Sequence, residues 1–567
     1  MSAQALSPEY RATAIERLAT GGELDVLVVG GGVVGCGSAL DAVTRGLRTG
    51  LIEQRDFASG TSSRSSKLIH GGLRYLEMYD FALVAEALKE RGLLLTRLAP
   101  HLVRPVPFLY PITKPVVERP YVAAGLALYD SMARASRHAA GLPWHKHLTR
   151  RQALKLAPAL KSTALVGAIQ YYDAKVDDAR HTMEIARTAA TYGAEVASRV
   201  AAVGFLRQGE RVTGVRALDK LTGREFEIPA RQVVNATGVW TDDTQALVGE
   251  RGQFHVRASK GVHLVVPRDR IHSRTGIILR TEKSVLFVIP WGRHWIIGTT
   301  DTDWALDKAH PAATCADIDY LLGHVNRILR TELTQADVEG VYAGLRPLLS
   351  GESEQTSKLS REHVVAHPTP GLVVVAGGKY TTYRIMAKDA IDEAARALGG
   401  DLPASTTEDI PMVGAVGYPA MWNRRKALAA ESGLHVERIE KMLMRHGVLI
   451  TEILELVAAD PSLGGPLPGG EDYLRAEIVY AASHEGALHL DDILARRTRL
   501  SIESFDRALT ASRPAAELVA PVLGWDRSAV EAEVRNYQAR VAAERASQTM
   551  PDDAAADRAR LQAPDGG

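Results

Sequence analysis

The sequence is poor in cysteine and has no long apolar run. Its 567 residues include two cysteines, Cys36 and Cys315, which stand far apart and without the spacing of metal ligands. This argues against a disulfide scaffold and against a zinc site, and we expect no metal. No apolar stretch approaches the roughly 18 to 20 residues that a helix needs to cross a bilayer, which excludes an integral membrane protein.

A secretory signal is also absent from residues 1–20, because charged residues such as Glu9 interrupt any apolar core. We therefore expect the chain in the cytoplasm. The formal net charge is +1, yet residues 91–151 hold ten Lys or Arg against two acids, Glu118 and Asp130. Because 567 residues are too many for one hydrophobic core, we expect two or three domains with a cleft between them.

A glycine loop follows the first apolar strand pattern. Residues 24–53 read as a strand, a glycine turn, an Ala-rich helix and a second strand, which together form a βαβ unit. Gly30 permits the tight turn, Gly32 lets a pyrophosphate approach the backbone, and Gly35 lets the helix pack against the strand. Glu53 ends the second strand, where a carboxylate accepts hydrogen bonds from ribose hydroxyls. The pattern predicts a dinucleotide site.

Two later segments repeat the apolar strand followed by a glycine turn. Residues 232–243 contain Ala236 and Gly238, and residues 371–384 contain Gly378 before a helical pattern. A domain that binds NAD does not need these turns. A flavin ring needs a positive potential near its pyrimidine end, which the helix amino terminus after Gly378 would supply. We therefore predict FAD as the cofactor, held by one domain assembled from distant segments.

The rest of the chain predicts two further regions. Short β-branched and aromatic segments at 262–269 and 284–301 indicate antiparallel strands of a substrate-covering sheet, and helical spacing dominates beyond residue 400. The predicted fold class is α/β plus α: a discontinuous Rossmann-like FAD-binding domain, an inserted antiparallel-sheet substrate domain and a helical C-terminal domain. We expect the FAD-binding domain at residues 20–100, 155–250 and 345–395, the substrate domain at 101–154 and 251–344, the helical domain at 400–545 and a flexible tail at 546–567.

Seven motifs between about residues 24 and 390 go beyond a generic flavin domain. They are TSSRSSKLIHGGLRYLE from residue 61, YYDAKVDDAR from 171, VVNATGVW from 233, SKGVHLVVP from 259, FVIPWGRHWIIGTTD from 287, YAGLRPLL from 342 and GGKYTTYR from 377. With these motifs the chain resembles the FAD-dependent, quinone-linked glycerol-3-phosphate dehydrogenases of aerobic bacteria and mitochondria. The region after residue 400 resembles the C-terminal domain of that family less specifically.

The resemblance implies a substrate pocket and a set of flavin contacts. A phosphate dianion requires several fixed cations, preferably arginines with bidentate geometry. Catalytic roles fall on His263, Arg346 and Lys379, and substrate-binding roles on Arg74, Tyr75 and Arg361. Together with the glycine loop, the resemblance assigns the flavin to Gly30, Gly32, Gly35, Glu53, Ser65, Ser66, Lys67, His70, Gly71, Gly72, Ala236, Gly238, Gly378 and Thr381.

The chemistry follows from these groups. Oxidation of a secondary alcohol removes the hydroxyl proton and transfers a hydride from C2 to flavin N5, so we expect sn-glycerol 3-phosphate to become dihydroxyacetone phosphate. Arg346 and Lys379 would hold the substrate and stabilise the developing alkoxide. His263 is our hypothesis for the proton acceptor, because the unperturbed pKa of histidine lies near neutrality. The alternative for this lone histidine in an apolar strand is a core residue.

The basic segment bears on where the electrons go. Residues 119–147 combine apolar residues at helical spacing with Arg134 and the aromatic Tyr121, Tyr129 and Trp144, which is typical of a helix lying in an anionic membrane surface. In the family that the chain resembles, this region faces the membrane, where quinone accepts the electrons. We expect peripheral association with anionic lipids on the inner face of the cell membrane. The alternative is a helix packed on its own protein with a solvated basic face.

Other functions stay open on the sequence alone. A soluble glycerol-3-phosphate oxidase that reduces oxygen to hydrogen peroxide would share the pocket motifs. A flavin amine oxidase needs fewer cations and lacks the SSKLIHGGLRY segment, and a non-catalytic flavin-binding protein would not need the four cationic and imidazole groups Arg74, His263, Arg346 and Lys379. The basic segment contains no nucleic-acid-binding module, so we expect no nucleic acid partner. The sequence is compatible with a homodimer.

Overall fold

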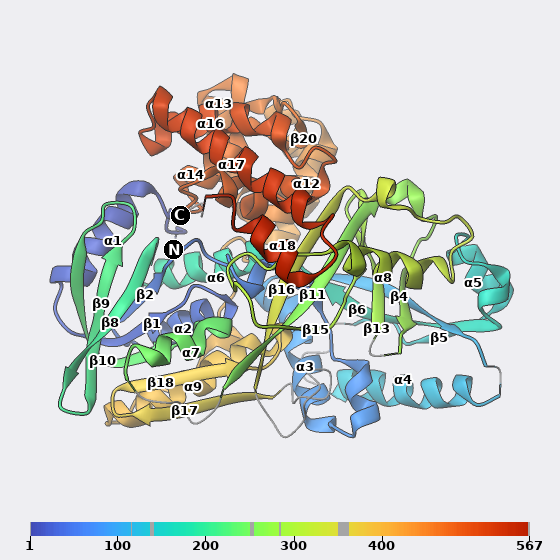
Figure 1. The fold of residues 1–567 in the computed structure, drawn as a ribbon, viewed down its shortest axis with the longest axis horizontal. Helices are drawn as coiled ribbons and strands as arrows, with labels where there is room; N and C mark the ends of the chain where they lie inside the picture. The colour runs from blue at the N-terminus through green and yellow to red at the C-terminus, as the bar shows by residue number, and fades with distance from the viewer. Residues whose placement is uncertain are drawn as a thin grey trace.

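Two large sheets lie side by side under a layer of C-terminal helices (Figure 1). The computed structural model describes residues 2–114, 116–135, 141–249, 255–282, 285–349 and 362–564, without the side chains of Arg74 and Glu77. One sheet occupies the left of Figure 1 and the other the right, and the helices drawn in orange and red lie above their junction.

The first sheet carries the glycine loop. Its strands follow the order β17-β18-β10-β1-β2-β7, and β8 and β9 continue antiparallel from β10. The bounds are β1 Leu24–Val29, β2 Thr49–Glu53, β7 Glu195–Ser198, β8 Val200–Gln208, β9 Arg211–Asp219, β10 Glu225–Asn235, β17 His363–Thr369 and β18 Leu372–Gly377. Strands β18, β10, β1, β2 and β7 run parallel. They are apolar on both faces because helices or strands cover both faces.

Three helices cover one face of this sheet, and a helix with the β8–β9 hairpin covers the other. Helices α2 (Val33–Thr44), α6 (Asp178–Thr191) and α9 (Tyr383–Leu398) bury their apolar sides against one face. Helix α1 (Pro8–Thr20) packs on the opposite face with Ile15 and Leu18. Because β1, β2, β10 and β18 are parallel, their carboxyl ends meet at one edge of the sheet, where α/β folds bind ligands.

The second sheet follows the order β15-β11-β14-β13-β12-β4-β6-β3, with β16 beside β11 and β5 beside β6. Its pairs are antiparallel except for β12 and β4, which run parallel. The bounds are β3 Leu68–Ile69, β4 Arg104–Ile112, β5 Lys146–Thr149, β6 Gly167–Lys175, β11 Val256–Pro267, β12 Gly276–Arg280, β13 Val285–Trp291, β14 His294–Gly298, β15 Thr302–Trp304 and β16 Gly340–Leu349. The expected antiparallel strands from 262 to 301 are therefore present as β11, β13 and β14.

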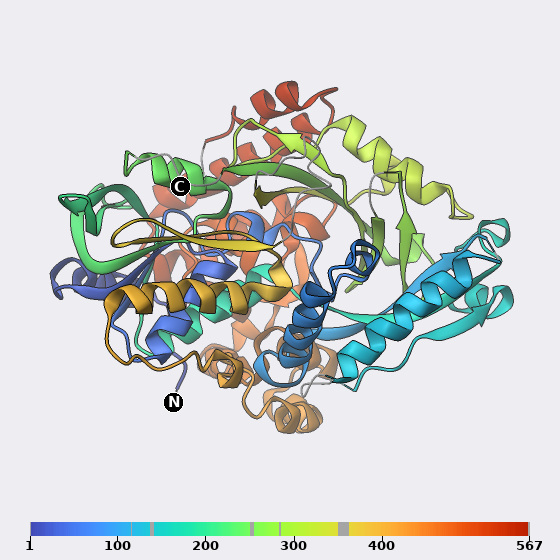
Figure 2. The same cartoon turned by 90° about the horizontal axis from the view of Figure 1, so that it is seen from below.

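Helices flank this sheet at its two faces. Helices α5 (Arg150–Leu156) and α8 (Cys315–Asn326) contribute to a core on one face. Helix α4 (Glu118–Ala135) buries Val122 and Leu126 in the core of the other face. With α3 (Phe81–Leu93), α4 lies at the bottom of Figure 1 and toward the viewer in Figure 2.

The C-terminal region is helical, as expected. Its main helices are α10 Tyr418–Asn423, α11 Arg425–Ser432, α12 Val436–His446, α13 Ile450–Ala459, α14 Arg475–Ser483, α15 Leu500–Glu503, α16 Leu509–Leu523, α17 Arg527–Ser547 and α18 Asp553–Arg560. Buried arginines join these helices to the first sheet: Arg497 forms an ion pair with Asp56 at 2.7 Å, and Arg180 forms one with Glu485 at 2.6 Å. Removal of either partner would leave a buried charge without its counter-ion.

One expectation about this region is wrong. Residues 546–564 are not a flexible tail, because α17 extends to Ser547 and α18 buries Ala556 against Leu345 and Trp304. The sequence there is rich in Ala, Asp and Arg, and its packing partners lie more than 200 residues away. The exact domain boundaries stay predictions: β3 and β6 lie in segments assigned to the FAD-binding domain, yet they pair within the second sheet.

The described part of the chain contains no helix that combines the length and the apolar character needed to cross a membrane.

Candidate functional site

The glycine loop forms a tight cradle at the carboxyl end of β1. Gly30 has a φ of +112°, and a Cβ there would lie 2.7 Å from the Ala236 carbonyl oxygen. A Cβ on Gly35 would lie 1.8 Å from the Gly30 carbonyl oxygen, so helix and turn touch directly. Gly32 is the N-cap residue of α2, and its neighbour Val33 donates its backbone N–H to Ser62 Oγ at 2.9 Å. A side chain on the first or the last of these glycines would push the loop apart.

Glu53 stands at the end of β2, facing the same loop. Its carboxylate accepts backbone hydrogen bonds from Gly31 at 2.6 Å and from Arg55 at 2.7 Å. Burial raises the pKa of this carboxyl group, while the two N–H donors act in the opposite direction. The carboxylate is thus fixed beside the cradle, which fits the ribose contact that the sequence predicts for it.

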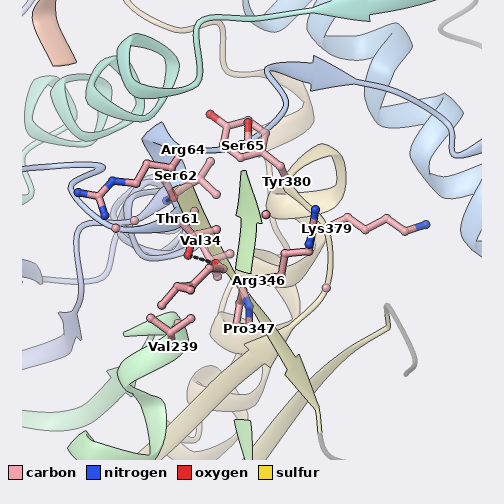
Figure 3. Close-up of a pocket in the computed structure, with 18 of the residues that line it drawn as sticks. Val34, Thr61, Ser62, Arg64, Ser65, Val239, Arg346, Pro347, Lys379 and Tyr380 are labelled. Carbon is pink, nitrogen blue, oxygen red and sulfur yellow. Dashed lines mark hydrogen bonds between the residues drawn. The ribbon is translucent and has the colours of Figure 1, made fainter. Parts of the chain in front are cut away.

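A cavity of about 1240 Å³ extends from this cradle to the second sheet. Typical small-molecule pockets measure roughly 300 to 1000 Å³, so the cavity has room for a dinucleotide and a small substrate. Figure 3 shows the residues of the turn at 61–65 on one side of it and Arg346 and Lys379 on another. The predicted residues that line it are Gly30, Gly32, Glu53, Ser65, Ser66, His70, Gly72, Tyr75, Ala236, Gly238, His263, Arg346, Gly378, Lys379 and Thr381.

Five predicted residues are not brought to the cavity or cannot be placed there: Gly35, Lys67, Gly71, Arg74 and Arg361. Gly35 and Gly71 lie behind its wall, where Gly35 packs on Gly30 and Gly71 donates its N–H to Tyr129 Oη at 2.8 Å. Arg361 lies outside the described residues, and the side chain of Arg74 is not described.

Lys67 differs from the expectation that it lies along the flavin. Its side chain is fully buried, and Nζ donates to Asp178 Oδ1 at 2.7 Å and to the Ser63 carbonyl oxygen at 3.0 Å. Asp178 also forms an ion pair with Arg499 of the C-terminal region at 2.6 Å. The ammonium group therefore belongs to an ion network behind the turn, because a buried charge requires a counter-ion.

Two cationic side chains reach the cavity from the second sheet and from the turn after β18. Arg346 of β16 donates to Thr299 Oγ1 at 3.0 Å and lies 3.5 Å from Asp301. Lys379 follows two glycines with positive φ, Gly377 and Gly378, and its Nζ lies 3.5 Å from the centre of the Tyr75 ring. The aromatic face attracts the ammonium group and fixes its place at the cavity wall.

The turn after β18 leads into a helix start. Thr381 accepts the backbone N–H of His70 at its Oγ1, at 3.2 Å, which ties this turn to the 70–72 segment. Helix α9 begins at Tyr383, so its amino-terminal dipole end points toward the cavity side of the first sheet. A helix start at this place fits the positive potential that the sequence predicts near the pyrimidine end of a flavin.

Two imidazoles line the cavity, and they differ in access. His263 exposes 2% of its surface, stacks on Tyr342 at 4.7 Å, and shares a hydrogen bond of 2.8 Å between Nε2 and Ser66 Oγ. Its Nδ1 is buried and has no hydrogen-bond partner among the described residues. Burial, followed by Arg346 and Lys67, lowers the pKa of His263 well below its ordinary value. The His263 ring is therefore neutral, and Ser66 and Tyr342 hold it in place.

His70 is the more accessible imidazole, and the sequence did not single out its side chain. It is only half-buried and faces the cavity. Withdrawal from water lowers its pKa, Asp173 raises it, and Lys379 lowers it. The ring is therefore neutral at pH 7 and can accept a proton. The sequence signal that could have identified this side chain is the motif His70-Gly71-Gly72, for which the sequence analysis assigned a flavin contact to the backbone alone.

A buried cluster supports the 70–72 segment from behind. Tyr129 of α4 donates its hydroxyl hydrogen to Asp173 Oδ1 at 2.6 Å and accepts the N–H of Gly71. Arg91 of α3 donates to the same carboxylate oxygen at 2.5 Å. Tyr129 was expected among the aromatics of a membrane surface, but it is fully buried. It faces inward because Val122, Leu126 and Tyr129 follow the spacing of one helix face.

The parallel sheet, the glycine cradle and the adjoining cavity define a protein of the FAD-dependent oxidoreductase class. A family model described as FAD-dependent oxidoreductase matches residues 25–384, and one described as the C-terminal domain of alpha-glycerophosphate oxidase matches residues 405–530. These matches confirm the expected fold class and the expected cofactor.

Relatives narrow the class further. Glycerol-3-phosphate dehydrogenase 2 of Mycobacterium tuberculosis is 59% identical over 563 residues, which cover 99% of this chain and 95% of the relative. The mitochondrial glycerol-3-phosphate dehydrogenase of Bos taurus is 37% identical over 93% of this chain and 74% of its own length. A solved structure of glycerol-3-phosphate dehydrogenase from Bacillus halodurans complexed with FAD has a TM-score of 0.77 at 29% identity, covering 94% of this chain and 98% of that one. The chain belongs to the family of FAD-dependent glycerol-3-phosphate dehydrogenases.

Proposed function

We propose that this protein oxidises sn-glycerol 3-phosphate to dihydroxyacetone phosphate and passes the electrons to a membrane quinone. The observation that carries the proposal is one cavity that joins a dinucleotide cradle to the cations Arg346 and Lys379 and to a half-buried imidazole. A phosphorylated polyol needs all of these groups, whereas an amine substrate does not need the cations.

The cofactor would be held by three parts of the chain. The amino terminus of α2 at Gly32 would hold the pyrophosphate, Glu53 would accept the ribose hydroxyls, and the Gly377–Gly378 turn would contact the flavin ring. Bound FAD supplies the acceptor for the hydride that leaves C2 of the substrate.

The phosphate and the hydroxyl of the substrate would meet different side chains. Arg346 offers a planar guanidinium that matches a phosphate, and its contacts with Thr299 and Asp301 hold it in place. Lys379 would act as a point charge that stabilises the developing alkoxide. The resemblance also gives substrate contacts to Arg74 and Arg361.

His70 is the better candidate for the proton acceptor. His263 holds its Nε2 against Ser66 and has its Nδ1 buried, so neither nitrogen is open to a substrate hydroxyl. His70 faces the cavity, and its lowered pKa keeps it neutral and ready to accept a proton at pH 7. We propose that His263 instead orients Ser66 at the cavity wall.

An apolar rim supports the membrane part of the proposal. It consists of exposed apolar residues beside the cavity mouth and on α3, α4 and the segments next to them: Met78, Tyr79, Phe81, Val116, Val117, Tyr121, Leu128 and Trp144. Met78 also lines the cavity, so the rim reaches its mouth. Exposed apolar side chains next to basic ones favour an anionic lipid surface. A quinone dissolved in that surface would arrive beside the cavity.

The test follows the product and the electron acceptor together. We expect purified holoenzyme to form dihydroxyacetone phosphate from glycerol 3-phosphate with a soluble quinone analogue, and to form little hydrogen peroxide in air. Peroxide in equal amount to product, with no gain from the quinone, would favour the oxidase instead. No product with either acceptor would contradict the proposed substrate.

A further inference from the structure

The C-terminal helix α18 packs against the strand pair that carries Arg346 (Figure 1). Strands β11 and β16 are antiparallel, with Ser259 opposite Arg346 and Lys260 opposite Leu345. Successive side chains of a strand point to opposite faces of a sheet. Lys260 and Leu345 therefore share the face opposite to that of Ser259 and Arg346.

Lys260 is held on its face by two carboxylates and an aromatic ring. Its ammonium group donates to Asp317 Oδ2 at 2.6 Å and to Asp553 Oδ1, and it lies 5.4 Å from the centre of the Trp304 ring. Lys260 exposes 1% of its surface, so its charge requires counter-ions. Asp317 belongs to α8 beside the second sheet, whereas Asp553 belongs to α18. The second ion pair therefore joins the C-terminal helix to β11.

Leu345 of β16 is supported by the same helix. Ala556 of α18 is fully buried in an apolar cluster with Leu345 and Trp304. The other end of α18 is fixed to α17, because Arg560 forms an ion pair with Glu544 at 2.6 Å. Helix α18 thus contacts both strands and is itself anchored to the C-terminal helices.

The guanidinium group of Arg346 depends on the position of β11. A Cβ on Gly261 would lie 2.6 Å from Arg346 Nη2, so this group lies directly over the strand. Its Nη2 donates to Thr299 Oγ1 at 3.0 Å, and its Nη1 donates to Ser259 Oγ at 3.4 Å. Gly261 follows Lys260 in the chain. A shift of β11 against β16 would therefore move the guanidinium group away from its place in the cavity.

We propose that α18 positions Arg346 for the phosphate of the substrate, and that Asp553 is a positioning residue that acts through Lys260. The inference rests on the proposed function, which assigns the phosphate to Arg346. Asp553 is not among the described residues that line the cavity. Its influence on substrate binding therefore passes through the two strands.

The sign of the effect separates positioning from simple electrostatics. Removal of the Asp553 carboxylate makes the local potential more positive, which by charge alone would tighten the binding of a phosphate dianion. Loss of a positioning contact weakens that binding instead. Lys260 keeps Asp317 as a counter-ion in such a variant, so its buried charge stays paired.

Stopped-flow reduction of the FAD-loaded protein by glycerol 3-phosphate separates substrate affinity from the limiting rate of flavin reduction. We expect Asp553→Ala to raise the apparent Kd about fivefold or more and to change the limiting rate by less than about twofold, because it weakens ground-state binding. Asp553→Glu should recover most of the affinity. In protein that carries Arg346→Gln, Asp553→Ala should have no further effect, because the positioned group is absent.

The matched control is Asp303→Ala. It removes an exposed carboxylate that forms an ion pair at 3.0 Å with Arg257, on the same strand β11. This control should leave the apparent Kd unchanged or lower it slightly. Flavin content and the thermal midpoint identify variants that fail to fold, and Asp553→Asn, which keeps the shape of the side chain, then carries the comparison.

Hydrogen exchange of the holoenzyme tests the inference without turnover. Asp553→Ala should speed the exchange of peptides from β11 and β16, and Asp303→Ala should not. If glycerol 3-phosphate does not reduce the flavin of the unmodified protein, the proposed function fails, and exchange alone decides whether α18 holds the strand pair. Unchanged or tighter binding in Asp553→Ala, an equal loss in the Arg346→Gln background, or unchanged exchange in both strands would overturn the inference.

Discussion

At the scale of single residues, the cavity separates two histidines that the sequence alone does not rank. His263 is enclosed by Ser66 and Tyr342, whereas His70 opens to the cavity beside Lys379 and Asp173. Both rings are neutral at pH 7 because burial lowers their pKa values. Access, and not charge state, therefore decides which ring can take a proton from a substrate hydroxyl.

This difference predicts unequal effects of matched substitutions. His70→Asn should slow flavin reduction by glycerol 3-phosphate by about 100-fold or more, the usual contribution of a general base. His263→Asn should slow it less, because it removes only the partner of Ser66. Stopped-flow measurement of the reductive half-reaction compares the two. A normal rate in His70→Asn with a large loss in His263→Asn would restore the assignment made from the sequence.

Residue positions were predictable where a short motif carries them. Gly30, Gly32 and Glu53 lie where the loop pattern places them, because one turn between adjacent strands determines their positions. The position of the Lys67 side chain was not predictable from its motif, because this side chain does not line the cavity. Its counter-ion Asp178 lies 111 residues further along the chain, and no local pattern reports such a pairing.

At the scale of elements, α4 has two functions on two faces. Its inner face buries Leu126 and Tyr129, and its outer face exposes Tyr121 and Leu128. The spacing of apolar residues predicts the helix, since it recurs every three or four positions. The spacing does not predict that Tyr129 faces inward, because the orientation of Tyr129 depends on Asp173 and Gly71, which belong to other elements.

The inner face predicts a coupling between α4 and the 70–72 segment. Tyr129→Phe would leave the N–H of Gly71 without its acceptor and would remove one of the two donors to Asp173 Oδ1, at a cost of about 1 to 3 kcal/mol in the free energy of unfolding. We expect slower flavin reduction as well, because His70 adjoins Gly71. Chemical denaturation and stopped flow measure the two effects. Tyr121→Phe, on the exposed face, is the control, and an equal loss there would contradict the coupling.

The outer face predicts lipid binding. Replacing Tyr79, Phe81 and Tyr121 of the apolar rim by Ser should reduce co-sedimentation with anionic vesicles about tenfold or more, because the apolar area available for burial falls. Leu221→Ser is the control, since Leu221 is exposed on the β9–β10 turn at the other end of the molecule (Figure 1). High salt should also release the unmodified protein. Equal sedimentation of all variants would rule out the rim as the docking surface.

At the scale of the whole molecule, buried ion pairs join the C-terminal helices to the two sheets. Arg497 and Asp56 are 441 residues apart in the chain, and Arg499 reaches Asp177 and Asp178. The sequence predicts that a helical C-terminal region exists, from its periodicity. It does not predict where that region docks, because each contact depends on two distant segments that fold separately.

This architecture predicts loss of stability in acid. His181 is buried and neutral, with a pKa lowered to about 3, and arginines such as Arg445 lower the pKa of Glu477 to about 2. The unfolded chain binds protons on these groups at higher pH than the folded chain does. Stability is therefore complete above pH about 6.5 and falls as the pH drops, first through His181 and below about 4.5 also through Glu477.

Thermal unfolding of the holoenzyme between pH 8 and 4 tests this expectation. The midpoint should stay level down to pH about 6.5 and then decline, with His181 contributing about 1.4 kcal/mol per pH unit. His181→Gln should flatten the decline between pH 6.5 and 4.5. A midpoint that is constant or rises over that interval would show that the buried groups do not titrate as proposed.

The central claim is that the cavity recognises a phosphorylated polyol and delivers its hydride to FAD. Anaerobic titration of the holoenzyme, followed by the visible absorption of the flavin, tests it most directly. We predict that glycerol 3-phosphate bleaches the flavin completely, while glycerol, lactate and amino acids leave it oxidised, because only the first carries the phosphate that Arg346 and Lys379 would bind. A flavin that stays oxidised with glycerol 3-phosphate, or that glycerol bleaches equally well, would contradict the claim.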